Sequence, residues 1–227
     1  MTEQVDLETY LFILQNKFLI SLYDPNKLKN YYTNEFYLGN KIDSIDVDHL
    51  NQFLDKNIFK IEKLTGKFVK NIFVVIENTE IFNFNIGLKK KNYDQLINKK
   101  HLENSLIDAK ELFNENYKEK KIMHILIEKY LIDGKSYSLH QDNLNGSNFC
   151  LEVQIRSIPL NLSHEIEKVL QKYQIKVIQY LDGNYIRNFF INSTIDFTQM
   201  SYAIKNGLNE NEVKLVPKNI KNIGFFE

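Results

Sequence analysis

Apolar and polar residues follow two different periods along this chain, and together they predict a mixed protein of helices and strands. Residues 10–24 contain two short apolar runs separated by Gln15-Asn16-Lys17, which predicts a tight β-hairpin. A third strand is expected over residues 31–38. Further strands are expected where short apolar or alternating runs recur, at residues 71–78, 81–88, 122–132, 150–156 and 175–181.

Helical spacing predicts three longer helices between these strands. Apolar residues recur every three or four positions over residues 46–64, with Asp46 as the expected N-cap and Gly66 as the stop. The same spacing occurs over residues 101–117 and 163–173, where Ser163 is the expected cap of the second. Weaker patterns predict short helices at residues 185–191 and 197–204 and a strand at 213–216. The order of elements indicates an α/β or α+β fold class.

The strongest β pattern lies between Lys121 and Arg156. The run 122–132 is too apolar for a strand with one solvated face, so both of its faces are expected to be covered. Asp133-Gly134 predicts a turn, and the alternation over residues 150–156 predicts a half-buried strand beside the first. The helices before and after this stretch are both expected to pack on its apolar face.

Composition narrows the function classes. The 227 residues carry a formal net charge of +0, so a nucleic-acid partner is not expected. No apolar run reaches the roughly 18 residues that span a membrane, and the acidic start lacks the order of a signal peptide. These features predict a cytoplasmic protein. The single cysteine, Cys150, excludes an internal disulfide and is expected to be a structural residue.

Few residues suggest cofactor or metal chemistry. The eight glycines are dispersed, so the clustered glycines of a phosphate-binding loop are missing. No two histidines are spaced for a helical metal site, and no metal is expected. His124 lies in an apolar run and is expected to be a hydrogen-bonded core residue. A small enzyme that uses His124, His140 and Asp142 for acid–base chemistry remains an alternative.

An ordered series of residues suggests a family. Glu62, Leu64 and Gly66 precede the apolar strand, and Gly87 lies in the next one. The most specific match is a run that resembles His-x-x-Pro-x-x-Tyr-x-x-Asp-Gly in spacing, followed by a counterpart of a Gly-Met-x-Gly loop; it consists of His124, Tyr130, Asp133, Gly134, Leu144 and Gly146. Over residues 10–190 the chain thus resembles the bacterial cell-division protein FtsA, an actin-like protein.

The resemblance implies a partial actin-like first lobe, with the second lobe missing. Residues 1–78 would form part of the first subdomain, and residues 79–181 the inserted strand–helix–strand–strand subdomain of FtsA. Residues 182–216 would return to the first subdomain, and residues 217–227 would form a tail. That tail has lysines beside apolar residues, but it is too short for more than weak membrane contact.

The chain departs from the family where the family binds ATP. The first phosphate motif of the family would fall at residues 13–16, which read Ile-Leu-Gln-Asn and contain neither Asp nor Gly. Ile127 replaces the family's proline in the matched run. The family's ATP is therefore not expected, nor is any other cofactor or any catalytic residue.

These features together predict a non-catalytic scaffold or adaptor of the division machinery, at the cytoplasmic face of the inner membrane. Its expected partners are divisome proteins, including FtsZ or FtsA itself, with self-association along the family's filament contacts. The residues expected to bind a partner are Asp133, Gly134, Leu139, Asp142, Leu144 and Gly146. The alternative within the same fold is an adaptor of pilus assembly that is similar to PilM.

Overall fold

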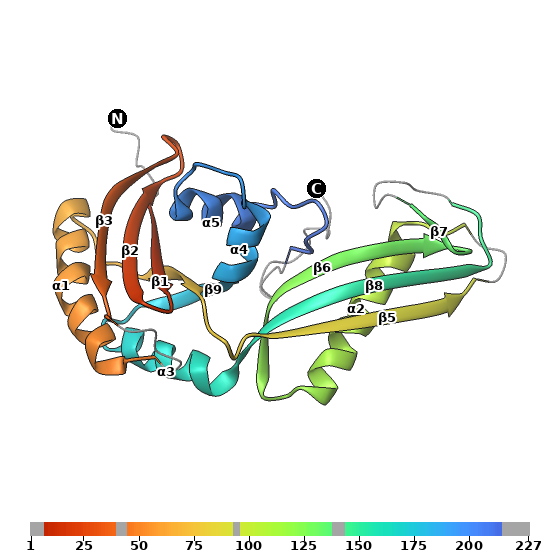
Figure 1. Ribbon diagram of the computed structural model, residues 1–227, viewed down its shortest axis with the longest axis horizontal. Helices are drawn as coiled ribbons and strands as arrows, with labels where there is room; N and C mark the ends of the chain where they lie inside the picture. Colours follow the sequence, from red (N-terminus) through yellow and green to blue (C-terminus); the bar gives the residue numbers. More distant parts are fainter. Residues whose placement is uncertain (1–6, 40–44, 93–95, 138–143, 215–227) are drawn as a thin grey trace. The chain divides into compact units, whose positions relative to one another are not determined.

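Two separate β-sheets, one of five strands and one of four, divide the chain into two units in the computed structural model (Figure 1). The structure describes residues 7–39, 45–92, 96–137 and 144–214. The first unit comprises residues 7–81 and 159–208, and the second comprises residues 82–158 and 209–214. The second unit is thus inserted into the first between residues 81 and 159.

The sheet of the first unit has the strand order β3-β2-β1-β4-β9. Its strands are β1 (Glu8–Ile13), β2 (Lys17–Asp24), β3 (Lys29–Tyr37), β4 (Asn71–Ile76) and β9 (Lys176–Asp182). β1, β2 and β3 pair antiparallel, as the predicted hairpin requires, whereas β1–β4 and β4–β9 are parallel. The carboxyl ends of β1, β4 and β9 therefore share one edge of the sheet.

Helices cover both faces of this sheet. They are α1 (Val47–Thr65), α3 (Leu160–Gln171), α4 (Gly183–Phe189) and α5 (Phe197–Lys205). Phe18 on β2 contacts Phe53 of α1, with ring centroids 6.1 Å apart, and Phe12 on β1 contacts Phe197 of α5 at 5.1 Å. Phe18 is paired with Ile13, the neighbour of Phe12, so the two rings point to opposite faces. The first unit is thus a sheet between two helical layers (Figure 1).

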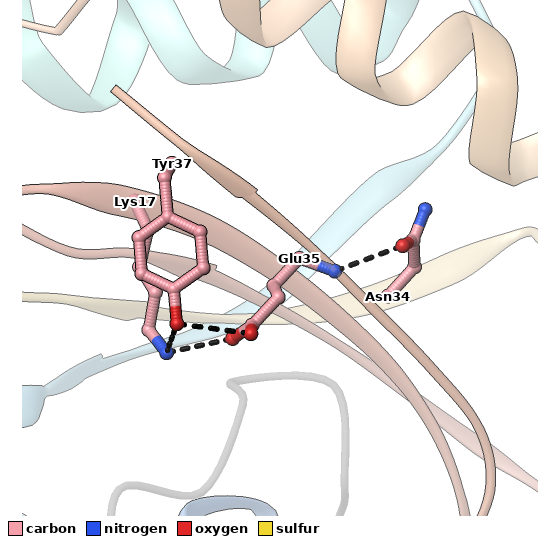
Figure 2. A network of polar contacts seen from close by, with 4 residues as sticks. All are labelled: Lys17, Asn34, Glu35 and Tyr37. Carbon is pink, nitrogen blue, oxygen red and sulfur yellow. Dashed lines mark hydrogen bonds and ion pairs between the residues drawn. The ribbon is translucent and has the colours of Figure 1, made fainter. Parts of the chain in front are cut away.

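Local chemistry explains where several of these elements begin and end. Asp46 caps α1 by accepting a hydrogen bond from the His49 amide at 3.0 Å, and Gly66 ends the helix with φ 68°. Figure 2 shows how the free ends of β2 and β3 are joined: Lys17 Nζ donates to Glu35 Oε2 at 2.7 Å, and Tyr37 donates to Glu35 Oε1 at 3.0 Å. The contacts of Asp46 and the conformation of Gly66 confirm the predicted caps of α1. The contacts among Lys17, Glu35 and Tyr37 fix the β2–β3 register at this end.

The sheet of the second unit has the order β5-β8-β6-β7. Its elements are β5 (Phe82–Lys91), α2 (Lys99–Asn116), β6 (Lys120–Ile132), β7 (Lys135–Ser136) and β8 (Asn148–Pro159). α2 packs on one face through Leu102, Leu106, Ala109 and Phe113, which share a buried core with β5, β6 and β8. The predicted packing of the preceding helix on this sheet is confirmed.

The predicted pair of strands is confirmed in most respects. β8 lies beside β6 and alternates between buried and half-buried residues from Asn148 to Arg156. β6 is buried without interruption from Met123 to Ile127, but Glu128 and Lys129 are exposed. The prediction that both faces are covered is therefore right for the first half of β6 and wrong for its middle. Residues 209–213 lie along this half, where the Val213 amide donates to Ile125 O at 2.9 Å.

The helix after β8 was predicted wrongly in two ways. α3 begins at Leu160, with Pro159 at the cap position, whereas Ser163 lies inside the helix and donates to Leu160 O at 2.9 Å. α3 also belongs to the first unit, where it contacts α1 and β9, and not to the sheet of β6 and β8. Its apolar positions Leu162, Ile166 and Leu170 need a covering surface, and the first sheet provides it.

The division into units differs from the expected one at its later boundaries. The inserted segment was expected over residues 79–181, but it ends at Ile158, because β9 pairs with β4 of the first sheet and α3 packs beside β9. The expected return segment, residues 182–216, is itself divided, since residues 209–214 lie against β6. The expected tail, residues 217–227, lies outside the described residues.

Candidate functional site

The edge at which β1, β4 and β9 end is one candidate site, because ligands of open parallel sheets bind outside the carboxyl ends of the strands. The polar side chains at this edge are those of Gln15, Glu77, Asn78 and Asp182. A hollow lined by Leu14, Gln15, Glu77 and Asn78, among others, has a volume of only ≈ 10 Å³. That is room for about one water molecule.

The β1–β2 turn is closed by its own backbone. The Leu14 amide donates to Lys17 O at 3.0 Å, and Asn16 O accepts a hydrogen bond from the Leu38 amide at 2.8 Å. The Leu14 side chain is 5% exposed, so it fills the space beneath the turn. A loop that holds a phosphate presents unused amides and small residues to it. This turn presents the side chains of Leu14 and Gln15 instead.

The acidic side chains at the same edge have structural contacts. Asp182, which is 1% exposed, caps α4 by accepting hydrogen bonds from the amides of Asn184 at 2.9 Å and Tyr185 at 3.3 Å. Glu77 forms an ion pair with Arg187, and the Arg187 guanidinium lies 4.0 Å from the centroid of the Phe197 ring. The carboxylates thus hold α4 and α5 to the sheet. Among the described residues, no cluster of three His, Cys, Asp or Glu side chains could hold a metal ion.

The end of the second unit is the other candidate, and it contains four of the six residues predicted to bind a partner. Asp133 and Gly134 form the β6–β7 turn, with φ 47° and 80°, which confirms the predicted turn. Leu144 pairs with Ile97 through two backbone hydrogen bonds of 2.8 and 3.0 Å. Leu139 and Asp142 lie outside the described residues.

Gly146 lies against the Asp133 turn. A Cβ atom at this position would lie 2.1 Å from Ile132 Cγ2 and 3.0 Å from Asp133 Oδ2, so a larger residue cannot fit without movement. The Gly146 carbonyl accepts a hydrogen bond from Asn92 Nδ2 at 2.8 Å. The structure therefore brings Asp133, Gly134 and Gly146 together.

The Asp133 carboxylate holds the start of β8. Its oxygens accept hydrogen bonds from the amides of Ser147 at 2.9 Å and Asn148 at 2.8 Å, and from Asn148 Nδ2 at 3.2 Å. The Ser147 amide, followed by the Asn148 side chain, lowers the pKa of Asp133 below its usual value. Asp133 is exposed, but its carboxylate already has these partners, so its first role is to fix the turn.

His124 is the one residue of the alternative acid–base set that the structure describes. It is 0% exposed, and its Nδ1 lies 2.6 Å from Glu212 Oε1. The expectation of a hydrogen-bonded core histidine is confirmed. Glu212 itself could not be found from the sequence, because it follows His124 by 88 residues. His140 and Asp142 lie outside the described residues.

Comparison with known proteins identifies a fold. No protein-family model and no curated protein matches the sequence. One solved structure, a PilM-PilN type IV pilus biogenesis complex, matches with a TM-score of 0.53 at 10% identity, covering 81% of this chain and 49% of that chain. The chain has an α+β fold that matches part of this structure. FtsA itself receives no separate support.

Two further structures match with lower scores. A protein of Bacteroides thetaiotaomicron with an actin-like ATPase fold and unknown function gives a TM-score of 0.36 at 15% identity, over 86% of this chain and 59% of that chain. The cytoplasmic domain of EpsL, from the type II secretion system of Vibrio cholerae, gives 0.35 at 8% identity, over 80% and 57%. The chain thus spans about half to three fifths of these structures. No described helix is both long and apolar enough to cross a membrane.

Proposed function

We propose that this protein is a non-catalytic adaptor that binds other proteins and does not bind ATP. The observation that carries the proposal is the closed β1–β2 turn, where the Leu14 amide is bonded to Lys17 O. In an actin-like fold the first phosphate contacts are expected at this turn. The sheet of the fold is present, but this turn is not built to bind a phosphate. We therefore infer that the protein uses its surface to bind partner proteins and does not catalyse a reaction.

The neighbouring residues support the same proposal. The carboxylates of Glu77 and Asp182 are bonded to Arg187 and to the start of α4, and the hollow beside the turn is about the size of one water molecule. His124 is enclosed, which counts against direct contact between its imidazole and a substrate.

Two assembly systems are candidates for the partners, and a different observation favours each. The fold match to a PilM-PilN complex favours pilus assembly. The spacing of His124, Tyr130, Asp133 and Gly134 favours a divisome scaffold similar to FtsA. In the structure, however, His124 and Tyr130 are buried at 0% and 4% exposure. Packing alone explains this spacing, so we place pilus assembly first. Both proposals put the protein at the inner face of the cell membrane.

Calorimetry of the purified full chain with ATP and Mg²⁺ tests the first part of the proposal. We expect no saturable heat. Saturable binding would overturn the proposal, because it would require a nucleotide site built from other residues.

Affinity capture from cells of the source organism tests the second part. We expect stoichiometric recovery of partner proteins, which belong to the pilus machinery in the first case and to the division machinery in the second. Capture of no stoichiometric partner by the tagged full chain would overturn the adaptor proposal.

A further inference from the structure

One hollow of the first unit lies at the opposite edge of the sheet from the closed β1–β2 turn. It is a cavity of ≈ 810 Å³ between the starts of β1 and β4, the end of β2 and the last turn of α1. Its apolar floor includes Leu22, Ile61 and Val69, which are 2%, 0% and 8% exposed. This volume is within the range of known ligand-binding pockets. We call it the α1-end groove.

Large apolar side chains stand exposed around the α1-end groove. Tyr31, Leu64 and Phe68 all line it, and their exposed fractions are 55%, 52% and 80%. Tyr31 lies where the β2–β3 register shifts, between the pairs Leu22–Tyr32 and Tyr23–Asn30, so it has no partner in the register. A β-bulge of this kind changes the direction in which a side chain points. Several exposed apolar side chains around one concave surface are typical of a protein interaction site.

The charges of the α1-end groove are mainly positive. Among the described residues that line it, Lys27, Lys67 and Lys70 are basic and Asp24 is acidic. Asp24 accepts hydrogen bonds from the amides of Asn26 at 3.0 Å and Lys27 at 3.2 Å. Within the described residues, the ammonium groups of Lys67 and Lys70 have no ion-pair partner. The groove therefore combines an apolar floor with two lysines whose charges are not neutralised there.

We propose that the α1-end groove binds an acidic segment of a partner protein that carries bulky apolar side chains. The apolar side chains would cover the floor and contact Leu64 and Phe68, and carboxylates would pair with Lys67 and Lys70. The proposal rests on the adaptor function and names its binding surface and the chemistry of its partner. A protein segment fits better than a membrane surface, because the apolar floor is recessed and a flat bilayer cannot reach it.

Site-specific photo-crosslinking in cells of the source organism tests this proposal. The full chain carries p-benzoylphenylalanine in place of Phe68, or in place of Phe59 as the control. Phe59 is 70% exposed on α1 and does not line the groove. We expect a crosslink from position 68 and none from position 59, and we expect the crosslinked peptide to be acidic and rich in apolar residues.

Charge reversal provides the second measurement. Lys67→Glu with Lys70→Glu should reduce the yield from position 68 about tenfold, since reversed charges at a rim slow association and repel an acidic partner. The matched control, Lys56→Glu with Lys60→Glu, makes the same change of charge at exposed positions outside the groove and should leave the yield unchanged. All four lysines are exposed, and a melting curve for each variant checks that its fold is intact.

The outcomes separate this proposal from the adaptor function. If wild-type capture recovers a partner but position 68 gives no crosslink, or gives a basic peptide, the groove proposal is overturned and the adaptor function stands. If wild-type capture recovers no partner, both are overturned. If position 68 crosslinks only to lipid, and the chain binds phosphatidylglycerol vesicles, the groove is a membrane contact and the proposal is overturned.

Discussion

His124 Nδ1 and Glu212 Oε1 lie 2.6 Å apart, although 88 residues separate them in the sequence. The imidazole is fully buried in β6, and the glutamate belongs to a short segment that pairs with the same strand, where Leu126 and Glu212 form a β-bridge. This contact connects the last described part of the second unit to its sheet. A histidine that could be mistaken for a catalytic group therefore has a structural role.

His124→Ala should lower the free energy of unfolding by about 2–4 kcal/mol, because it leaves a cavity and removes a partner of the glutamate. Urea unfolding of the full chain, followed by circular dichroism, measures the change. His164→Ala is the control, since His164 is exposed on α3, and it should change stability by less than about 0.5 kcal/mol. Equal effects from the two substitutions would contradict the structural role of His124.

Gly146→Ala should destabilise the second unit by about 1–3 kcal/mol, because the new methyl group would overlap Ile132 Cγ2 at 2.1 Å and force the turn to shift. Thermal unfolding measures the loss. Gly87→Ala is a matched control on β5, where a Cβ meets nothing within 4 Å, and it should be close to neutral. A neutral Gly146→Ala would show that the turn moves at little cost.

Asp133→Asn should destabilise the protein at neutral pH, and this destabilisation should disappear in acid. The pKa of Asp133 is lowered in the folded state, chiefly by the hydrogen bond from the Ser147 amide. A carboxylate whose pKa is lowered on folding stabilises the folded protein at pH values above its unfolded pKa of about 3.9. That stabilisation disappears as the pH falls through the folded pKa. The difference between wild type and variant should thus be constant from pH 7 to about pH 5 and shrink below about pH 4.

Urea unfolding at several pH values measures this difference. Glu111→Gln, at an exposed position on α2, is the control and should show a smaller difference at every pH. A difference for Asp133→Asn that persists unchanged at pH 3 would show that its carboxylate does not act through its charge.

Much of the fold could be predicted because its signals are local. The β1–β2 hairpin, the caps of α1 at Asp46 and Gly66, and the Asp133-Gly134 turn each depend on a few adjacent residues. The alternation along β8 likewise shows which of its residues face the core and which do not. Periodicity reveals that a face is apolar, but it does not reveal which surface will cover it.

The parts that could not be predicted depend on contacts between distant segments. α3 was assigned to the sheet that precedes it, although it packs on α1 and β9. Residues 211–213 beside β6 are too few to show a period, so their pairing and the contact of Glu212 were missed. At the candidate site, the role of Asp133 at Ser147 and Asn148 follows from the β6–β8 arrangement, which the sequence does not specify.

Ser163→Ala distinguishes the sequence-based start of α3 from the observed one. As an N-cap, Ser163 would satisfy an amide of the first turn, and its loss would cost about 1 kcal/mol. In the structure its hydroxyl instead donates to Leu160 O, a carbonyl of the helix itself, and its side chain is fully buried. We expect Ser163→Ala to change the free energy of unfolding by less than about 0.5 kcal/mol, since alanine favours the helix interior and removes only this local bond.

Urea unfolding measures the difference, with Asp182→Ala as the reference for a true cap. Asp182 accepts two amide hydrogen bonds at the start of α4, so Asp182→Ala should lower the free energy of unfolding by at least about 1 kcal/mol. A cost for Ser163→Ala as large as that for Asp182→Ala would place the start of α3 at Ser163 after all.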